Sequence, residues 1–140
     1  MLVDTGGLLI RAVVHAASIS DRDGAKLVLA GIGERCPTLR QLWLDAGYQG
    51  TAVTWIEQEL GLSVTVVRKP RRWVRWPADQ EPPPMPTGFQ VLPRRWVVER
   101  TFAWLGRYRR LSKDYEALPE TEEAWISLAM SSLLLARLAK

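Results

Sequence analysis

The pattern of apolar and polar residues predicts a β-hairpin at the start of the chain. Leu2 and Val3 read as a strand stub, the Gly-rich residues 4–7 as a turn, and the mostly apolar residues 8–16 as a longer strand. The first strand has almost no length. Because a domain rarely begins at the last residues of a strand, we expect the natural fold to start upstream of Met1.

A helix is predicted next, where capping residues precede apolar positions at helical spacing. Ser20, Asp21 and Asp23 supply N-cap candidates and acidic groups for the positive end of the helix. Apolar residues then recur from Leu27 to Ile32, before Pro37. The simplest interpretation of Asp21 and Asp23 is therefore that they cap this helix.

The following residues have the order strand, helix, strand. Residues 41–44 form an apolar strand, 45–50 a turn-rich stretch, 51–61 a helix capped by Thr51 and stopped by Gly61, and 63–67 a β-branched strand. Such a βαβ unit implies parallel pairing. The predicted fold class is α/β.

The second half of the chain divides into a loop and two helices. Residues 69–93 contain seven of the nine prolines and predict a long basic loop with polyproline character. Helices are expected over about 94–111 and 122–139, the second capped by Thr121. The predicted organisation is thus 1–68 (hairpin and βαβ unit), 69–93 (loop) and 94–140 (two helices).

Positive charge is concentrated in one part of the chain. Residues 68–110 carry 11 Lys and Arg against 3 Asp and Glu, although the net charge of all 140 residues is only +4. Trp73, Trp76 and Trp96 stand among these arginines, as in surfaces that bind phosphates and stack on bases. A solvated basic face with inward-pointing tryptophans is an equally good interpretation of the composition.

Several protein classes are excluded by composition. No apolar run reaches the roughly 18 residues of a membrane span, and Asp4 interrupts the apolar start, which lacks the basic region of a secretory signal. Cys36 has no second cysteine to pair with, and His15 alone does not complete a zinc site. We expect a cytoplasmic protein whose metal ligands, if it has any, are carboxylates.

Two acidic residues are candidates for chemistry. On a helical wheel Glu99 lies within a basic stripe formed by Arg95, Arg110 and Lys113, opposite an apolar face. Asp45 follows a predicted sheet strand, at the strand end where α/β folds place active-site carboxylates. Taken singly, Glu99 is more simply explained by an ion pair with Arg95 within its helix, and Asp45 is explained equally well by a turn. Together they predict a site for Mg²⁺, which prefers carboxylate oxygens.

Five motifs resemble the catalytic domain of the DDE transposases of bacterial insertion sequences. They are VDTGGLL at 3–9, HAA at 15–17, DRDGA at 21–25, LDAGYQG at 44–50 and RWVVERTFAWL at 95–105. The resemblance extends from Val3 to about Leu135 and covers the C-terminal two-thirds of that domain. It implies a ribonuclease H-like mixed sheet flanked by helices, and DNA transposition by metal-dependent strand cleavage and strand transfer at the ends of the element.

The resemblance also implies residue roles. Asp45 corresponds to the second catalytic and metal-binding acid, Glu99 to the third, and Arg95 to the basic residue one turn before it. A complete site in this family holds two Mg²⁺ or Mn²⁺ ions. One ion activates water or a 3′-hydroxyl, and the other stabilises the leaving oxygen.

The family's first acid has no counterpart in this sequence. It belongs to a strand upstream of the hairpin, so Asp4 corresponds to the hairpin aspartate and not to the missing ligand. By the resemblance, that strand lies between the hairpin and residues 41–44. We therefore expect a domain truncated at its N-terminus, either the second frame of a frameshifted element or a degenerate relic, and inactive alone.

Binding of double-stranded DNA at insertion-sequence ends is expected from the basic residues. The candidates are Arg71, Arg72, Arg94, Arg95, Arg107, Arg110 and Lys113. Other expected partners are an upstream fragment supplying the first Asp and, in the complete protein, further copies of the chain. The expected location is the bacterial cytoplasm, with the nucleoid.

Two alternative functions remain open at this point. A non-catalytic nucleic-acid-binding module would use the same basic residues, and an autonomous nuclease would have the same fold. Tyr48 is a candidate for stacking on a base or ribose beside Asp45, or simply closes a turn. His15 is interpreted as a strand residue.

Overall fold

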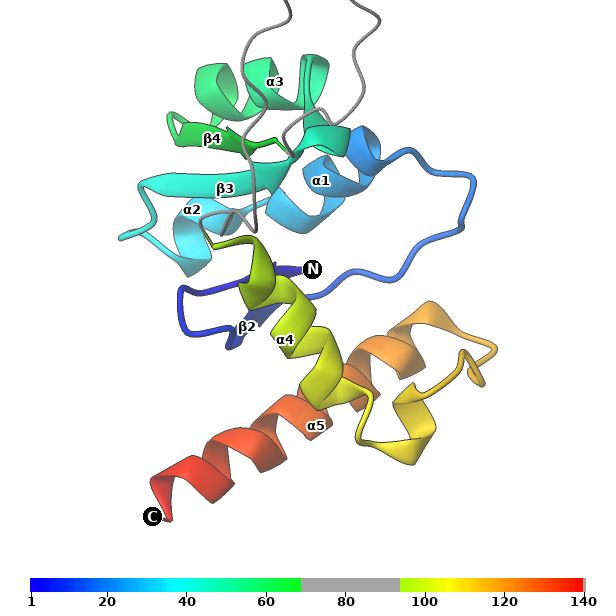
Figure 1. Cartoon of the computed structure of the whole chain (residues 1–140). Helices are drawn as coiled ribbons and strands as arrows, with labels where there is room; N and C mark the ends of the chain where they lie inside the picture. The colour runs from blue at the N-terminus through cyan, green and yellow to red at the C-terminus, as the bar shows by residue number, and fades with distance from the viewer. Residues whose placement is uncertain (69–93, 140) are drawn as a thin grey trace, which may run out of the picture.

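The computed structural model describes residues 1–68 and 94–139 (Figure 1). The loop predicted over 69–93 lies outside the described residues. The elements, in chain order, are β1 (Leu2–Val3), β2 (Leu9–Arg11), α1 (Asp21–Leu29), α2 (Ile32–Arg35), β3 (Gln41–Asp45), η1 (Ala46–Tyr48), α3 (Thr51–Glu59), β4 (Ser63–Val67), α4 (Arg95–Leu105), η2 (Arg109–Leu111) and α5 (Pro119–Leu138).

The predicted hairpin is confirmed, but its second strand is shorter than expected. β1 and β2 pair antiparallel, with Leu2 opposite Arg11 and Val3 opposite Leu9. The expected strand over residues 8–16 is wrong after Arg11, because β1 is too short to offer further partners. Beyond β2 the chain contacts α5 instead of a strand. The Val14 amide donates a hydrogen bond to Glu123 Oε1 of α5 at 2.8 Å.

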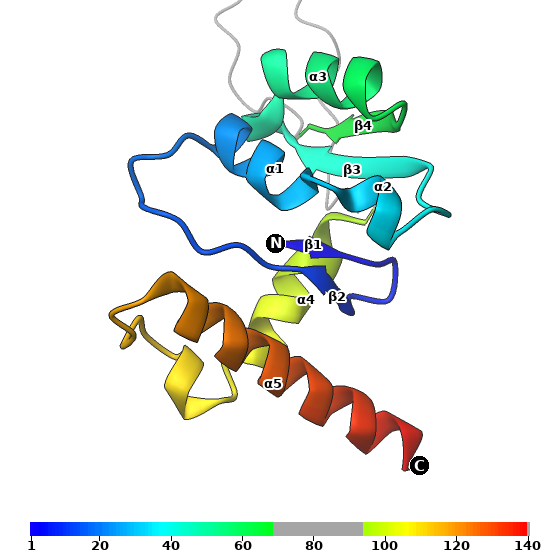
Figure 2. The same ribbon diagram turned by 180° about the vertical axis from the view of Figure 1, so that it is seen from behind.

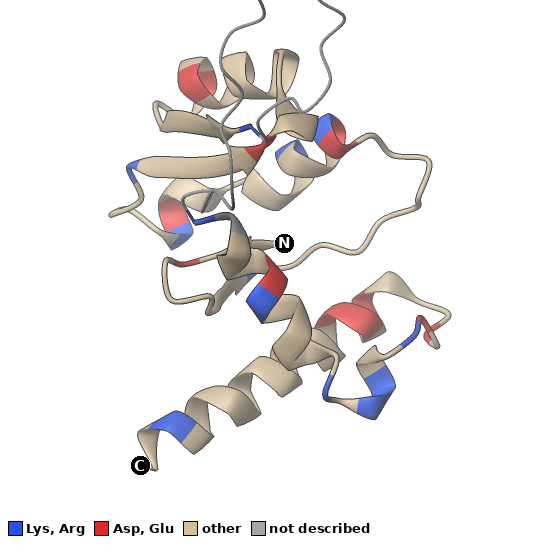
Figure 3. Cartoon of the chain, in the orientation of Figure 1, with Lys and Arg blue, Asp and Glu red and all other residues tan. Residues whose placement is uncertain are grey.

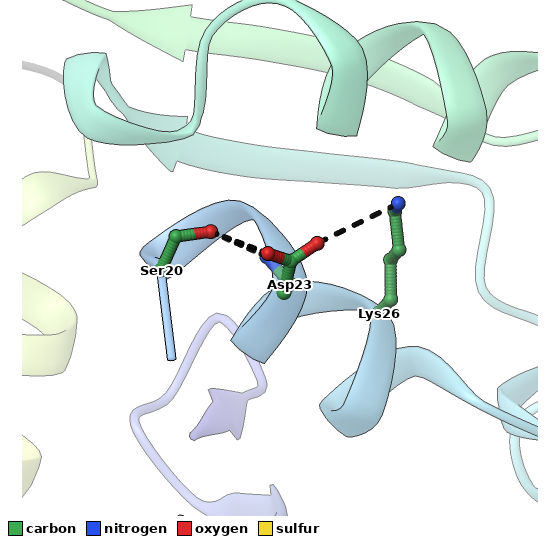
Figure 4. A network of polar contacts seen from close by, with 3 residues as sticks. All are labelled: Ser20, Asp23 and Lys26. Carbon is green, nitrogen blue, oxygen red and sulfur yellow. Dashed lines mark hydrogen bonds and ion pairs between the residues drawn. The ribbon is translucent and has the colours of Figure 1, made fainter. Parts of the chain in front are cut away.

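Of the predicted N-cap candidates for α1, Ser20 is confirmed, whereas Asp21 and Asp23 lie in the first turn of the helix and are not its cap. Ser20 is the N-cap, and its hydroxyl accepts from the Asp23 amide at 3.3 Å and donates to the Asp23 carboxylate at 2.7 Å (Figure 4). Asp23 also pairs with Lys26 at 3.7 Å, on the exposed side of the helix. The helix does not continue to Ile32 as predicted, because Gly31 adopts a left-handed conformation, with φ of 66°, and separates α1 from α2.

The parallel βαβ unit is also confirmed. β3 and β4 pair in parallel with α3 between them in the chain, and Asp45 lies opposite Val67 at the carboxyl end of both strands. α3 begins at Thr51 as expected, although the N-cap is Gly50 rather than Thr51. Asp45 thus stands at the strand end that the sequence predicted.

The hairpin and the parallel pair do not join into one sheet. Within the described residues each is a two-stranded sheet of its own, and Figures 1 and 2 show the hairpin on the β3 side of the pair. The single mixed sheet expected from the resemblance is therefore not formed by the described strands alone. The overall class, mixed α/β, agrees with the prediction.

The C-terminal helices differ from the prediction in their ends. α4 stops at Leu105 rather than near Leu111, because Gly106 ends it and the chain turns into the short η2. α5 begins at Pro119, whereas the predicted helix began after a cap at Thr121. Proline is favoured at the first position of a helix, because the N–H that it lacks would have no partner within the helix there. Figure 2 shows the last part of α5 extending away from the other elements.

Two apolar clusters hold these elements together. The first joins α1, α2, α3 and β3 through Leu29, Ile32, Leu42 and Ile56. The second joins the end of α4 to α5 through Leu105, Ala129 and Met130. Among the described helices none is long and apolar enough to cross a membrane.

Candidate functional site

A cavity of about 370 Å³ lies between the hairpin, α1, β3 and α4, and we call it the central pocket. Its apolar walls come from Leu2, Val28, Leu42 and Leu44, among others. The polar and charged side chains that line it are His15, Asp21, Asp45, Tyr48, Arg94 and Glu99. Both acidic residues predicted from the sequence therefore line the same cavity.

Asp45 reaches this pocket because it ends β3. Its carboxylate oxygen Oδ1 accepts a hydrogen bond from the Gly47 amide at 2.8 Å, which caps η1 and turns the chain sharply after the strand. The side chain is exposed. The turn interpretation of Asp45 is thus confirmed. Asp45 also lines the cavity, and its role as a site residue stays a prediction.

Glu99 reaches the pocket from α4, a helix that buries its opposite side. Val97, Thr101 and Leu105 are buried, as the predicted apolar face requires, whereas Glu99 is exposed. Val98 and Phe102 line the pocket beside Glu99. The face of α4 that carries Glu99 is therefore turned toward the cavity that Asp45 also lines.

Asp21 is a third acid of the pocket, although its sequence pattern predicted only a capping role. The carboxylate oxygens Asp21 Oδ2 and Asp45 Oδ1 both lie 3.1 Å from the place a Cβ atom would take at Gly47. The two carboxylates are therefore neighbours. The DRDGA motif was the signal that could have pointed to Asp21, but nothing in its local pattern distinguishes a cap from a pocket residue.

Tyr48 lies close to the carboxylates of Asp21 and Asp45. Burial raises the pKa of its phenol above the ordinary value, and the negative charges of Asp21 and Asp45 raise it further. The hydroxyl therefore keeps its proton, and can donate a hydrogen bond, up to a higher pH than an ordinary tyrosine. Tyr48 lines the pocket, as its proposed position beside Asp45 requires.

His15 is a pocket residue rather than a strand residue, because β2 ends before it. Its ring packs on α1, where Nε2 lies only 2.6 Å from the place a Cβ atom would take at Gly24. The other ring nitrogen, Nδ1, lies 3.1 Å from the Ala16 carbonyl oxygen. Glycine at position 24 therefore admits the imidazole to the wall of the pocket.

Arg94 brings a guanidinium group to the central pocket. Its guanidinium carbon lies 4.4 Å from the centre of the Trp43 ring, within the range of a cation–π contact. Arg94 precedes α4 with φ of 58°, the only non-glycine residue in the described chain with a positive φ. Arg94 thus combines a sparsely populated backbone conformation with a side chain stacked on Trp43 of β3.

The other predicted DNA-binding residues are dispersed. Because α4 ends at Leu105, Arg110 and Lys113 do not continue the stripe around Glu99. Arg110 lies on η2 and instead pairs with Glu116 at 2.6 Å. Figure 3 shows basic and acidic segments interspersed over the described elements. Arg107 is exposed beyond the end of α4. Arg71 and Arg72 lie outside the described residues, as does the side chain of Arg95.

The donor chemistry of the pocket suits a hard divalent cation, but the set is incomplete. Asp45 and Glu99 offer carboxylate oxygens of the kind that Mg²⁺ and Mn²⁺ prefer. Residues 1–68 and 94–139 contain no group of three His, Cys, Asp or Glu side chains arranged to hold a metal ion. The two acids therefore fit part of a site.

Comparison with known families decides the relationship. The family model described as "Transposase DDE domain" matches residues 1–134. The chain belongs to the transposase DDE domain family. The family named from the motifs is thus confirmed, while searches of curated proteins and of solved structures give no significant match.

Membership of this family carries several general consequences. The DDE transposases are catalytic proteins of DNA transposition, with a ribonuclease H-like fold, divalent metal ions and DNA as their substrate. The small mixed α/β architecture seen here agrees with that fold class. The roles of individual residues in this chain do not follow from membership and are proposed below.

Proposed function

We propose that this chain supplies the second and third acids of a DDE transposase site, Asp45 and Glu99. The observation that carries the proposal is that both line the central pocket, although they come from β3 and α4. The pocket lies at the carboxyl end of a parallel strand pair, where sheets of this class place their reacting groups.

Asp45 and Glu99 would hold the divalent ions that the family uses. When bound, such ions activate a water or a 3′-hydroxyl and stabilise the leaving oxygen during cleavage and strand transfer at insertion-sequence ends. The two carboxylates would hold the ions by their oxygens. The guanidinium of Arg94 would neutralise a DNA phosphate at the pocket, and Arg95, Arg107 and the basic residues of 69–93 would hold the flanking backbone.

The acid that the family has first in the chain would come from an additional β-strand. The hairpin and the β3–β4 pair are separate, and the cavity between them has apolar walls that include Leu2, Leu42 and Leu44. A strand between β1 and β3 would cover these apolar walls, join the two sheets into one and bring its Asp beside Asp45 and Glu99 at the polar end of the pocket. We propose that an upstream segment or a separate fragment provides it, in the bacterial cytoplasm where the DNA lies.

Manganese binding tests the roles of Asp45 and Glu99 without requiring catalysis. Mn²⁺ is titrated into the wild-type chain and into Asp45→Asn and Glu99→Gln, and bound Mn²⁺ is measured by electron paramagnetic resonance. We expect each substitution to weaken binding at least about tenfold, because each removes one charged ligand. Glu57→Gln, on the exposed side of α3, is the matched control.

Unchanged Mn²⁺ affinity in both variants, with circular dichroism showing them folded, would contradict the proposal. It would favour the non-catalytic DNA-binding module, whose carboxylates serve only as ion-pair partners. Weakened binding in Glu57→Gln would show that the assay reports overall charge rather than the pocket.

A further inference from the structure

Two consecutive residues of α4 bind two consecutive carbonyl groups of the hairpin turn. Arg100 Nη2 donates to the Gly6 carbonyl at 2.5 Å, and Thr101 Oγ1 donates to the Gly7 carbonyl at 2.7 Å. The Thr101 hydroxyl also lies 3.1 Å from the Val97 carbonyl oxygen, four residues earlier in its own helix. Thr101 is fully buried. Thr101 lies on the buried face of α4, and the apolar pattern of that face gave no indication of a polar contact.

The turn fits closely against α4 at Gly7. Gly7 has φ of 80°, a conformation that favours glycine. A Cβ atom there would lie 3.0 Å from Thr101 Oγ1, 3.1 Å from Arg100 Nη2 and 3.2 Å from the Trp104 ring. The hairpin backbone therefore rests directly on the helix, without space for a side chain between them.

Asp4 gives the turn the shape that this contact needs. Its Oδ1 accepts hydrogen bonds from the Gly6 and Leu8 amides, both at 2.8 Å. The backbone adds a bond from the Gly7 amide to the Asp4 carbonyl at 3.0 Å. The two carbonyl groups that α4 binds are thus presented by a turn with a fixed conformation.

Arg100 is itself held in place from both sides. Its guanidinium carbon lies 4.4 Å from the centre of the Trp96 ring and 4.7 Å from that of Trp104. The two rings belong to α4, one turn before and one turn after Arg100. The donor that reaches Gly6 is therefore pre-oriented by its own helix.

A contact through two adjacent residues restricts the rotation of a helix about its axis, which a single contact does not. Successive side chains differ by about 100° around the helix. Glu99 immediately precedes Arg100, so the orientation fixed at residues 100 and 101 also fixes the direction of Glu99.

We propose that Thr101 is a positioning residue for Glu99, and that its hydrogen bond to Gly7 holds α4 with Glu99 facing the central pocket. This inference rests on the proposed function only for the role of Glu99. The positioning itself concerns α4 and the hairpin, and it is measurable in the chain without metal or DNA.

The test compares Thr101→Val, which keeps the shape and removes the donor, with Thr101→Ser, which keeps the donor. Spin labels are placed at exposed positions 103 on α4 and 58 on α3, in a chain with Cys36→Ala, and their distance distribution is measured by pulsed paramagnetic resonance. Thr54→Val is the matched control, because Thr54 is a helical threonine whose hydroxyl also faces the carbonyl four residues earlier, at 3.5 Å.

We expect the distribution to broaden at least about twofold in Thr101→Val and to stay unchanged in Thr101→Ser and Thr54→Val. Mn²⁺ affinity should fall by about tenfold in Thr101→Val alone, since a mobile Glu99 is a poorer ligand. If Thr101→Val does not fold, Asp4→Ala, which loosens the turn, is compared with Asp4→Asn, which keeps the acceptor oxygen.

An unchanged distance distribution in folded Thr101→Val would overturn the proposal. A broadened distribution with unchanged Mn²⁺ affinity would also overturn it, provided that Glu99→Gln weakens Mn²⁺ binding. If Glu99→Gln has no effect on Mn²⁺ either, the proposed function fails, and the distance measurement alone decides whether Thr101 positions α4.

Discussion

The carboxylates of Asp21 and Asp45 lie side by side, each 3.1 Å from the position of a Cβ atom at Gly47. One comes from the first turn of α1 and the other from the end of β3. A side chain at position 47 would crowd both carboxylates. The absence of a side chain at Gly47 thus allows α1 and β3 to bring two negative charges to one end of the central pocket.

The first prediction concerns Tyr48, whose pKa is raised by burial and then by Asp21 and Asp45. Asp45→Asn and Asp21→Asn should each move the pKa of Tyr48 back toward its ordinary value of about 10. The measurement is the tyrosinate absorbance during a pH titration, with Tyr48→Phe identifying the signal. Asp23→Asn, on the exposed side of α1, is the control, and an equal effect there would contradict the assignment.

The raised pKa of Tyr48 also predicts how stability depends on pH. The folded state holds the phenol proton more tightly than the unfolded state, so this contribution is complete below about pH 10. It is lost as the pH rises through the pKa of the folded state. The free energy of unfolding, from urea melts between pH 9 and 11, should therefore fall less steeply in Tyr48→Phe than in the wild type.

A second prediction tests the contact between His15 and Gly24. Gly24→Ala should bring little or no gain in stability, because the new Cβ would lie 2.6 Å from His15 Nε2 and the imidazole would have to move away. In a His15→Ala background the same substitution should stabilise by about 0.5–1 kcal/mol, since alanine favours a helix interior over glycine. Thermal or urea melts of the four proteins give the coupling, and an equal effect in both backgrounds would show no contact.

Catalysis by the chain alone is the subject of a third prediction. With linear DNA and Mn²⁺ we expect at most trace nicking and no strand transfer, because the described residues hold no group of three metal ligands. Adding an upstream fragment that carries an Asp on a β-strand should raise cleavage. Robust cleavage without the fragment, abolished by Asp45→Ala, would show that the site is complete here and would favour an autonomous nuclease.

A fourth prediction concerns DNA binding and salt. The excess of positive charge between residues 68 and 110 should give non-specific duplex binding that weakens steeply as the salt concentration rises. Replacing Arg71 and Arg72 by alanine should reduce the slope of log affinity against log salt by about 1 for each phosphate that the chain no longer neutralises. Arg22→Ala, on α1, is the control, and a flat salt response in the wild type would identify the basic residues as an ordinary solvated face.

Local patterns in the sequence determined most of the elements. The cap at Ser20, the Gly-rich turn of the hairpin and the β-branched run of residues 63–67 depend on neighbouring residues only, so they can be recognised without knowledge of the fold. The same holds for the position of Asp45 at a strand end. The predicted ends of two elements were wrong because the local pattern continues further than the tertiary contacts. Residues 12–16 have a strand-like pattern but no partner strand among the described residues, and the helical pattern continues beyond Gly106, where α4 ends.

Which side chains share the central pocket was decided only by the tertiary structure. Asp21 and His15 looked like a cap and a strand residue, because helix spacing and strand alternation say nothing of what an element packs against. Their place in the pocket results from the packing of α1 beside η1 and of the loop after β2 against α1. The rotation of α4 that turns Glu99 to the pocket likewise accompanies contacts with Gly6 and Gly7, which lie 94 residues earlier in the chain and leave no periodic signal in the sequence.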